Sequence, residues 1–189
     1  MTVKLLAVSG ALRRESTNTR LAAEALRLFG PAEADWADLR LPLYDGDLED
    51  AEGLPAPVRR LIAQIRAADG VIISTPEYNK NLPGVLKNAL DWVSRDKPMA
   101  LAGKPVAIMS AAAGRAGGER SQFSLRHCLT PFTPRILQGP EVTIAGSGDA
   151  FDAAGRLTDP RSLETLTQLM QALREEIALA GGERARKAA

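Results

Sequence analysis

The sequence predicts an α/β fold in which a mostly parallel sheet is covered by helices on both faces. Short apolar runs rich in β-branched residues alternate with segments of helical periodicity along the whole chain. Strict alternation of this kind favours parallel strands joined by helical crossovers. The chain has 189 residues with no internal repeat and no linker-like segment, a common size for one domain with one core. We therefore expect a single domain over residues 1–189, with a frayed tail over 181–189.

The first half of the chain is expected to contain two strands and two helices. A strand over residues 3–8 leads through a polar loop into a helix, and a weaker strand follows at 35–39. Apolar spacing marks the first helix by Leu21, Leu26 and Phe29, and the second by Val58, Leu61, Ile62 and Ile65. Between the second strand and the second helix, residues 41–55 form a long connection rich in Pro, Gly and Asp.

The second half of the chain continues the alternation. Strands are expected at 70–75, 104–110 and 138–144, the last with Glu141 at its centre. Helices are expected at about 84–94 and at 163–179. Between them, another helix is expected to contain Phe123, Leu125 and Leu129. Because the crossovers between parallel strands are right-handed, few topologies are open to such a chain.

Composition excludes several classes of function. The formal net charge is +1, which argues against electrostatic capture of nucleic acid or of a membrane surface. No apolar run approaches the roughly 20 residues of a spanning helix, and the chain enters a strand at once without a signal-peptide pattern. A single cysteine, Cys128, excludes an internal disulfide. We therefore expect a protein of the reducing cytoplasm.

Cysteine and metal chemistry are not expected. His127, the only histidine, precedes Cys128 in a segment that is predicted to be helical. Adjacent helical residues point about 100° apart and do not form a nucleophilic pair. A zinc site needs about three or four suitable ligands, so we expect no metal. Any difficult chemistry is then expected to belong to an organic cofactor.

Three loops are expected to meet at the carboxyl edge of the sheet, where ligands bind in open α/β folds. The first, residues 9–19, offers hydroxyls, amides and two arginines at the start of a helix, without a dinucleotide or triphosphate fingerprint. Helix N-termini bind phosphate through free N–H groups and the macrodipole, so the loop suits a terminal phosphate monoester. The alternative is that Ser16, Thr17 or Asn18 only caps the helix.

The second loop, residues 75–83, follows the third strand and is the most informative segment. Pro76 and Pro83 restrict its backbone, so fixed amides can face a planar ligand without an ordering cost on binding. One aromatic residue and two amides suit a flat ring with polar edges, such as a flavin. Glu77 receives no catalytic role, because hydride transfer to a flavin needs no general base.

The third loop, residues 110–118, is nearly free of side chains. Its glycines allow the backbone to approach a flat ligand closely. A flexible turn without ligand contacts is the alternative. Arg115 in this loop faces either an anionic ligand or solvent.

Together these motifs resemble the NADPH-dependent FMN reductases of flavodoxin-like fold, a group that includes bacterial quinone, azo-dye and chromate reductases. The resemblance spans about residues 3–180. It rests on Ser-Gly-Ala-Leu-Arg at 9–13, on Pro-Glu-Tyr-Asn at 76–79 with its continuation to Trp92, and on residues 110–118; the middle motif is long and specific. The resemblance implies a doubly wound, five-stranded parallel sheet of order 2-1-3-4-5 in three α/β/α layers.

The resemblance also assigns residues to FMN. The phosphate would be held by Ser9, Arg13, Ser16 and Asn18. The isoalloxazine would be lined, largely through backbone, by Pro76, Glu77, Tyr78 and Asn79, with Ser110 and Gly114 on its other side. No catalytic side chain is implied, because the chemistry takes place at N5 of the flavin.

Assembly and acceptor preference follow from the same resemblance. Family members form dimers, often paired into tetramers, with flavin sites near the subunit interface. A homodimer or homotetramer is therefore implied, and residues 40–56 and the helix carrying Arg126 are the expected interface. Two positions depart from the family pattern: Ala11 stands where Ser is common, and Lys80-Asn81 replaces an aromatic or small pair. Because Lys80 and Asn81 face the substrate side, we expect a shift toward anionic acceptors.

The expected function is that of an FMN-dependent NAD(P)H oxidoreductase. NADPH or NADH would deliver a hydride to bound FMN and leave, and the acceptor would then take electrons at the same face. Quinones are the first expected acceptors, followed by azo compounds, metal oxyanions and free flavin. One alternative is a flavodoxin-type electron carrier without NAD(P)H oxidation, although such carriers are typically strongly acidic and this chain is not. The other is a non-redox phosphate-ligand binding module.

Overall fold

Three buried strands form the centre of a parallel sheet in the computed structural model, which describes residues 2–188. They are β1 (Lys4–Ser9), β3 (Gly70–Ser74) and β4 (Pro105–Ala111). Every residue of β3 and β4 is buried, as is usual for parallel strands covered on both faces. At one edge β2 (Glu33–Trp36) pairs with β1, and at the other β5 (Arg135–Ile136) and β6 (Val142–Ile144) both pair with β4. The strand order β2-β1-β3-β4-β5 confirms the predicted order.

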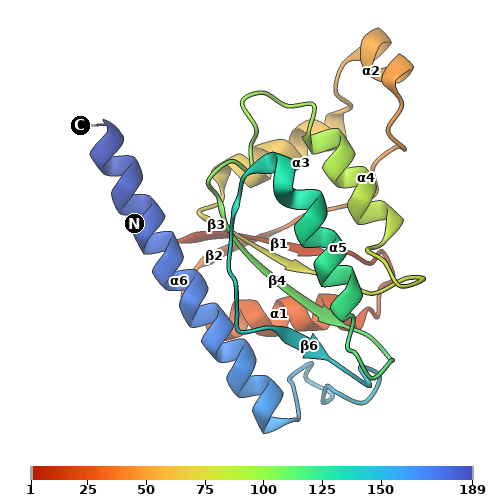
Figure 1. The fold of residues 1–189 in the computed structure, drawn as a ribbon, viewed down its shortest axis with the longest axis vertical. Coiled ribbons are helices and arrows are strands. Elements are labelled where there is room, and N and C mark those ends of the chain that lie inside the picture. The colour runs from red at the N-terminus through yellow and green to blue at the C-terminus, as the bar shows by residue number, and fades with distance from the viewer. Residues whose placement is uncertain (1, 189) are drawn as a thin grey trace.

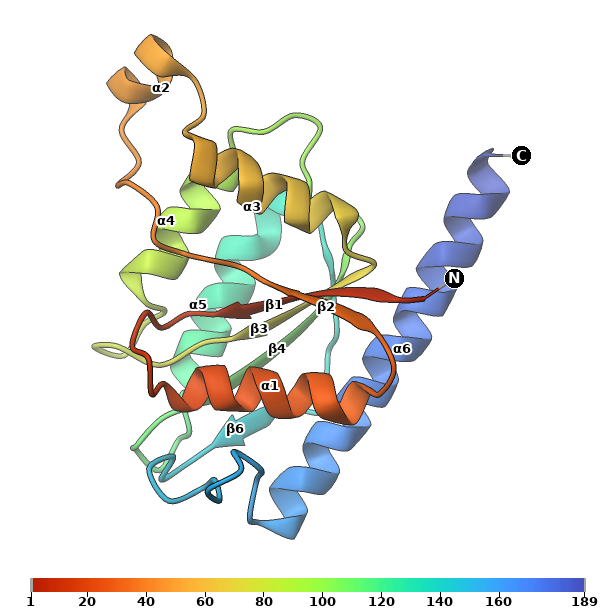
Figure 2. The same cartoon turned by 180° about the vertical axis from the view of Figure 1, so that it is seen from behind.

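Helices cover both faces of the sheet (Figures 1 and 2). On one face lie α1 (Thr17–Phe29) and α6 (Pro160–Ala188), and on the other lie α3 (Ala56–Ala67), α4 (Gly84–Val93) and α5 (Glu119–Leu129), which is followed by the short 3₁₀ helix η1 (Thr130–Phe132). Alternate residues of β1 serve different faces: Leu5 packs with α1 and α6, whereas Leu6 packs with α3, α4 and α5. Within residues 2–188, no helix combines the length and apolar character needed to cross a membrane.

The second strand lies two residues earlier than expected, at 33–36 instead of 35–39. Its four residues are all exposed, so no apolar pattern marks it, and its position is set by pairing of Lys4 with Glu33 and of Ala7 with Trp36. Leu39, which we expected in the strand, leaves the sheet and is buried in the core beside α3 and α4.

The expectation of one continuous strand over 138–144 is wrong. Within that segment only Val142–Ile144 forms a strand, β6, whereas β5 precedes the segment at Arg135–Ile136 and Pro140 lies between the two. Proline has no N–H to donate to a β-ladder, which explains the interruption. Glu141, expected at the strand centre, is exposed and precedes β6.

The connection over residues 41–55, which we call the strap, contains the short helix α2 (Gly46–Glu52). Asp45 caps helix α2, because its side chain accepts a hydrogen bond from the Asp47 N–H. No residue of α2 is buried. Figures 1 and 2 show α2 projecting from the body of the molecule beyond α4.

The base of the strap is fixed to α4 by polar contacts. The Pro42 carbonyl accepts hydrogen bonds from Asn88 Nδ2 at 2.9 Å and from Trp92 Nε1 at 2.8 Å. The Tyr44 N–H donates to Asn88 Oδ1 at 2.8 Å. Asn88 and Trp92, which belong to the long motif after the third strand, therefore hold the strap in place.

Helix α6 continues beyond its expected end at residue 179. It passes through Gly181 and Gly182 and reaches Ala188, so the tail expected from residue 181 is helical up to there, and Ala189 lies outside the described residues. Glu183 in this extension forms an ion pair with Arg135 at 2.8 Å. That contact joins the extension to β5 and offsets the poor helix propensity of the two glycines.

Candidate functional site

A pocket of about 380 Å³ lies at the carboxyl edge of the sheet, where the loops after β1, β3, β4 and β6 converge. Its lining includes six of the ten residues that the sequence assigned to a cofactor: Arg13, Ser16, Asn18, Pro76, Glu77 and Tyr78. A larger pocket, of about 530 Å³, lies at the opposite edge beside Lys104 and Arg135, far from these loops. The loops to which the sequence assigned the cofactor therefore border a pocket.

The start of α1 forms one end of the pocket. Ser16 has extended backbone and caps the helix by accepting a hydrogen bond from the Asn18 N–H at 3.2 Å. The N–H groups of Thr17 and Thr19 have no acceptor among residues 2–188, as expected for the first turn of a helix. Arg13, which is exposed, lines the same end. Ser16 thus caps the helix and leaves two backbone donors for an anion.

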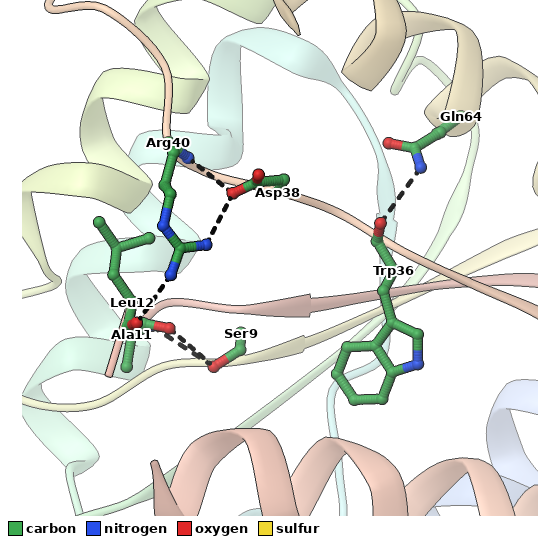
Figure 3. A network of polar contacts seen from close by, with 7 residues as sticks. All are labelled: Ser9, Ala11, Leu12, Trp36, Asp38, Arg40 and Gln64. Atoms are coloured by element: carbon green, nitrogen blue, oxygen red, sulfur yellow. Dashed lines mark hydrogen bonds and ion pairs between the residues drawn. The ribbon is translucent and has the colours of Figure 1, made fainter. Parts of the chain in front are cut away.

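The loop between β1 and α1 is held from outside by Arg40 (Figure 3). The Arg40 guanidinium donates to the Leu12 carbonyl at 3.1 Å and to Asp38 Oδ1 at 3.2 Å. Within the loop, the Ala11 N–H lies 3.4 Å from Ser9 Oγ. Figure 3 also shows Gln64 of α3, which donates to the carbonyl of Trp36 at 3.1 Å and fixes the end of β2. The loop is therefore positioned before any ligand binds.

Ser9 is placed next to the pocket but not in its lining. Its hydroxyl accepts a hydrogen bond from Thr19 Oγ1 at 2.9 Å, which ties the loop to the first turn of α1. Ala11 adds no side-chain donor. The groups at this end whose charge or free N–H donors suit an anion are consequently Arg13 and the start of α1.

Asn18 is buried beneath the pocket, with only 2 % of its surface exposed. Its Oδ1 accepts hydrogen bonds from Ser74 Oγ at 2.9 Å and from the Ala111 N–H at 3.0 Å, while its Nδ2 donates to the Ala111 carbonyl at 2.8 Å. The side chain therefore joins α1 to the ends of β3 and β4. This engagement leaves it little capacity to hold a phosphate.

The loop after β3 is packed against the loop after β1. The Gly10 N–H donates to the Ser74 carbonyl at 2.8 Å. A Cβ at Gly10 would lie 3.0 Å from Cδ of Pro76, a tighter approach than most side-chain contacts. Glycine at position 10 thus brings the two walls together without displacing Pro76.

A tight turn forms the tip of the loop after β3. The N–H and carbonyl of Tyr78 exchange hydrogen bonds with those of Asn81, at 3.0 and 3.1 Å. Between them Asn79 and Lys80 have φ values of 50° and 65°, as in a type I′ turn. Tyr78 lines the pocket, whereas Asn79, Lys80 and Asn81 are exposed outside its lining. Lys80 and Asn81, which we expected on the substrate side, therefore lie at the tip of this hydrogen-bonded turn.

Neither Ser110 nor Gly114 lines the pocket. Ser110 is fully buried, and its hydroxyl donates to the Gly117 carbonyl at 2.7 Å and accepts from Gln122 Nε2 at 2.8 Å. Gly114 is exposed at a turn closed by the Gly117 N–H. The wall is instead made by residues 111–113, so Ser110 shapes the loop without facing the cavity.

The structure adds pocket residues that the sequence interpretation did not assign to the cofactor. Ser147 is 6 % exposed and accepts a hydrogen bond from Thr17 Oγ1 at 3.2 Å. It lies in residues 145–149, the loop after β6, which reaches the same edge as the other three loops. The Gly146-Ser147-Gly148 sequence was the available signal, because it follows the expected last strand, which ends at residue 144 as β6 does.

This arrangement fits FMN. Free backbone N–H groups and Arg13 at the start of α1 match a phosphate, and the loops after β3 and β4, which form two walls of the pocket, match a flat ring. Among residues 2–188, no cluster of three or more His, Cys, Asp or Glu side chains is arranged to hold a metal ion.

Comparison with known proteins gives the same result. The model of the NADPH-dependent FMN reductase family matches residues 3–149. An NAD(P)H-dependent FMN reductase of Pseudomonas aeruginosa is 44% identical over 173 residues, which cover 90% of this chain and 93% of the relative. A quinone reductase of Escherichia coli strain K12 is 40% identical over 180 residues, covering 93% and 95%.

A solved structure agrees with both sequence relatives. The flavoenzyme NAD(P)H:(acceptor) oxidoreductase of Paracoccus denitrificans superposes with a TM-score of 0.85 at 29% identity, covering 95% of this chain and 99% of that one. The family match extends well beyond half of the chain and includes every loop of the pocket. By fold, pocket and sequence alike, this chain belongs to the NADPH-dependent FMN reductase family of oxidoreductases.

Proposed function

We propose that this protein uses NADPH or NADH to reduce quinones through bound FMN. The observation that carries the proposal is the pocket at the carboxyl edge, where a helix start with free N–H donors faces two rigid backbone loops. The name of the E. coli relative, a quinone reductase at 40% identity, supports quinones as the acceptors. Azo compounds, metal oxyanions and free flavin are further acceptors that the same open site would admit.

The two ends of the pocket divide the binding of FMN. We assign the phosphate to Arg13, Ser16 and the start of α1, with the hydroxyls of Thr17 and Ser147 beside it. The ring is assigned to the backbone of residues 76–78 and of residues 111–113. Ser9, Asn18 and Ser110 shape these loops through their hydrogen bonds, while Asn79 and Gly114 lie beyond the pocket lining.

When bound, FMN supplies the redox chemistry by accepting a hydride from the nicotinamide and passing electrons to the acceptor. The protein's own residues bind and orient. Fixed loops hold the ring without an ordering cost, and the first turn of α1 neutralises the phosphate. No side chain in the pocket is assigned an acid–base role.

Charge around the pocket favours anionic acceptors. The two carboxylates that line it are paired: Glu15 with Arg20 at 2.8 Å and Glu77 with Arg120 at 3.5 Å. Among residues 2–188, Arg13 and Lys80 have no carboxylate within ion-pair distance. Because Arg13 is assigned to the phosphate, we assign Lys80 and its neighbour Asn81 to contact with the acceptor substrate.

Kinetics of Lys80 variants across an acceptor panel test this assignment. Lys80→Ala is expected to raise KM for anionic quinones and azo dyes by about 1.5-fold to fivefold, the effect of losing one exposed charge pair, and to leave KM for neutral quinones unchanged. Lys80→Arg keeps the charge at the same position and serves as the matched control. An unchanged KM for the anionic acceptors in Lys80→Ala would remove the role of Lys80.

We further propose that residues 1–189 form one FMN-binding domain that works in the cytoplasm as a homodimer or homotetramer. Support for assembly comes from large apolar side chains left at the surface: Leu43 on the strap is 81% exposed and Phe123 on α5 is 55% exposed. Both lie in the segments expected at the interface, the strap and the helix carrying Arg126. Light scattering of the purified protein measures this assembly, and a monomer would exclude it.

A further inference from the structure

Glu77 occupies an unusual position for an acidic residue in a ligand-binding loop. Its side chain is only 14% exposed, and its carboxylate accepts a hydrogen bond from the backbone N–H of Arg120 at 3.2 Å. The Arg120 guanidinium approaches the same carboxylate at 3.5 Å. The carboxylate therefore faces the first turn of α5, 43 residues away in the sequence.

The first turn of α5 lacks a capping group of its own. Helix α5 begins after Gly118, which has a φ of 92° and no side chain to cap the helix. A carboxylate is the preferred partner of free N–H groups at a helix N-terminus, through both hydrogen bonding and the macrodipole. Glu77 supplies that cap from another segment of the chain.

The position of this cap matters because it joins two walls of the pocket. Glu77 belongs to the loop after β3, and α5 follows directly on residues 111–118, the loop after β4. Nearer the sheet the two walls are joined by the Thr75 N–H, which donates to the Met109 carbonyl at 2.9 Å, and by Asn18, which bonds both Ser74 and Ala111. At the start of α5, Ser121 Oγ lies 3.5 Å from the Thr75 carbonyl, and Glu77 makes the shorter contact at 3.2 Å. Glu77 thus joins the two walls at the start of α5.

We propose that Glu77 is a positioning residue, which sets the width of the ring-binding slot by holding the loop after β3 against the start of α5. This inference rests on the proposed function, since the slot is assigned to the flavin ring. Arg120 is 57% exposed at its side chain and contributes chiefly its backbone N–H. The proposal therefore predicts a large effect of changing Glu77 and a small effect of removing the Arg120 guanidinium.

Titration of apo-protein variants with FMN and with riboflavin, followed by flavin fluorescence, tests the proposal. Glu77→Ala is expected to raise the Kd of both flavins by about tenfold, the size of one charge-assisted hydrogen bond. Glu77→Gln keeps one acceptor oxygen and is expected to recover most of this loss, and Arg120→Ala to change Kd by no more than about threefold. Glu15, the other carboxylate that lines the pocket, lies beside Ser16 at the phosphate end, so Glu15→Gln is the matched control for riboflavin, with an expected change in the Kd of riboflavin below about twofold.

Two comparisons separate positioning from a general loss of structure. Arg13→Ala changes only the phosphate end of the pocket, so it should raise the Kd of FMN but not that of riboflavin. A change in the ring slot should raise the Kd of both flavins alike. Hydrogen exchange of residues 112–118 in the apo protein should become faster in Glu77→Ala than in Glu15→Gln. A Glu77→Ala protein that melts earlier but binds both flavins as tightly as the parent would overturn the proposal.

The same experiment distinguishes failure of the proposed function. If the parent protein bound neither flavin, the assignment of the pocket to FMN would be wrong, and the inference about the ring slot would fall with it. If the parent bound FMN and Glu77→Ala bound it equally well, only the inference would fall. Should Glu77→Ala not fold, Glu77→Asp, whose carboxylate is one methylene shorter, takes its place: a raised Kd for both flavins supports the proposal, and Kd values equal to those of the parent overturn it.

Discussion

Asn18 lies under the pocket and joins three segments of the chain through a single side-chain amide. The sequence suggested a phosphate ligand because Asn18 follows Ser16 at the start of a helix. Its direction depends on Ser74 and Ala111, which are far away in the sequence. The Ser110 hydroxyl is likewise occupied by contacts within the protein, with Gly117 and Gln122. The sequence could place Asn18 and Ser110 near the site, but it could not show that their polar groups bond other parts of the protein.

Replacing Asn18 is expected to lower stability. Asn18→Ala leaves the Ser74 hydroxyl and both backbone groups of Ala111 without the partners they have in the folded protein. Unpaired buried polar groups cost about 1–3 kcal/mol each, partly relieved by water or relaxation, so we expect a loss of about 3 kcal/mol in the free energy of unfolding. Urea denaturation measures it.

The control for this prediction is Gln168→Ala. Gln168 is an exposed amide on α6 with one long hydrogen bond to Glu164 at 3.4 Å, and its removal should change the free energy of unfolding by less than about 0.5 kcal/mol. Equal stability of the Asn18 and Gln168 variants would contradict the structural role of Asn18.

At the scale of elements, the strap depends on a cluster of three side chains. Glu49 of α2 accepts hydrogen bonds from Arg95 Nε at 2.7 Å and from the Tyr44 hydroxyl at 3.0 Å. The Tyr44 ring meets Trp92 edge-on, with centroids 4.9 Å apart. These contacts explain how a segment with no buried helical residue keeps a defined position. The sequence showed only a Pro-, Gly- and Asp-rich connection, because the partners of Glu49 and Tyr44 lie on or just after α4.

The pH dependence of the strap follows from this cluster. The hydrogen bond from Arg95 is the main cause that lowers the pKa of Glu49 below its ordinary 4.5. The hydrogen bond to Glu49 is the main cause that raises the pKa of Tyr44 above 10.0. Glu49 therefore stabilises the docked strap fully above pH 4.5 and loses this effect as pH falls through its lowered pKa, while Tyr44 loses its effect above pH 10.0.

Tryptophan fluorescence can follow the acid side of this dependence. In a Trp36→Phe background, Trp92 is the only indole, and its environment should change as acid protonates Glu49 and releases the strap. Glu49→Gln removes the titrating group, so its Trp92 signal should no longer show that acid step. An identical acid transition with and without Glu49 would contradict the assignment.

Differences between expected and observed elements occur at the edges of the sheet. The central strands β1, β3 and β4 were predictable because their burial requires continuous apolar runs. β2 is exposed, and β5 and β6 have only two and three residues, so local pattern is weak and pairing with a neighbour decides their bounds. Ser147, one of the pocket residues, follows β6 in a loop that the sequence interpretation did not assign to the site.

At the scale of the whole molecule, topology brings distant segments to one edge. Loops after β1, β3, β4 and β6 form one pocket because parallel strands all end on the same side. The strand order and the family membership of the chain confirm the predicted flavodoxin-like fold and the class of FMN- and NAD(P)H-dependent oxidoreductase. The contact between Glu77 and α5, on which we propose that the width of the ring slot depends, could be recognised only in the structure.

The central claim is that the pocket holds FMN and that NADPH or NADH reduces it for transfer to a quinone. Anaerobic addition of NADPH to the FMN-loaded protein, followed by a quinone, tests this directly by absorbance. We predict that the yellow colour bleaches on addition of NADPH and returns on addition of the quinone. A yellow protein that neither NADPH nor NADH bleaches would indicate an electron carrier, and a colourless protein that cannot be loaded with FMN would contradict the account altogether.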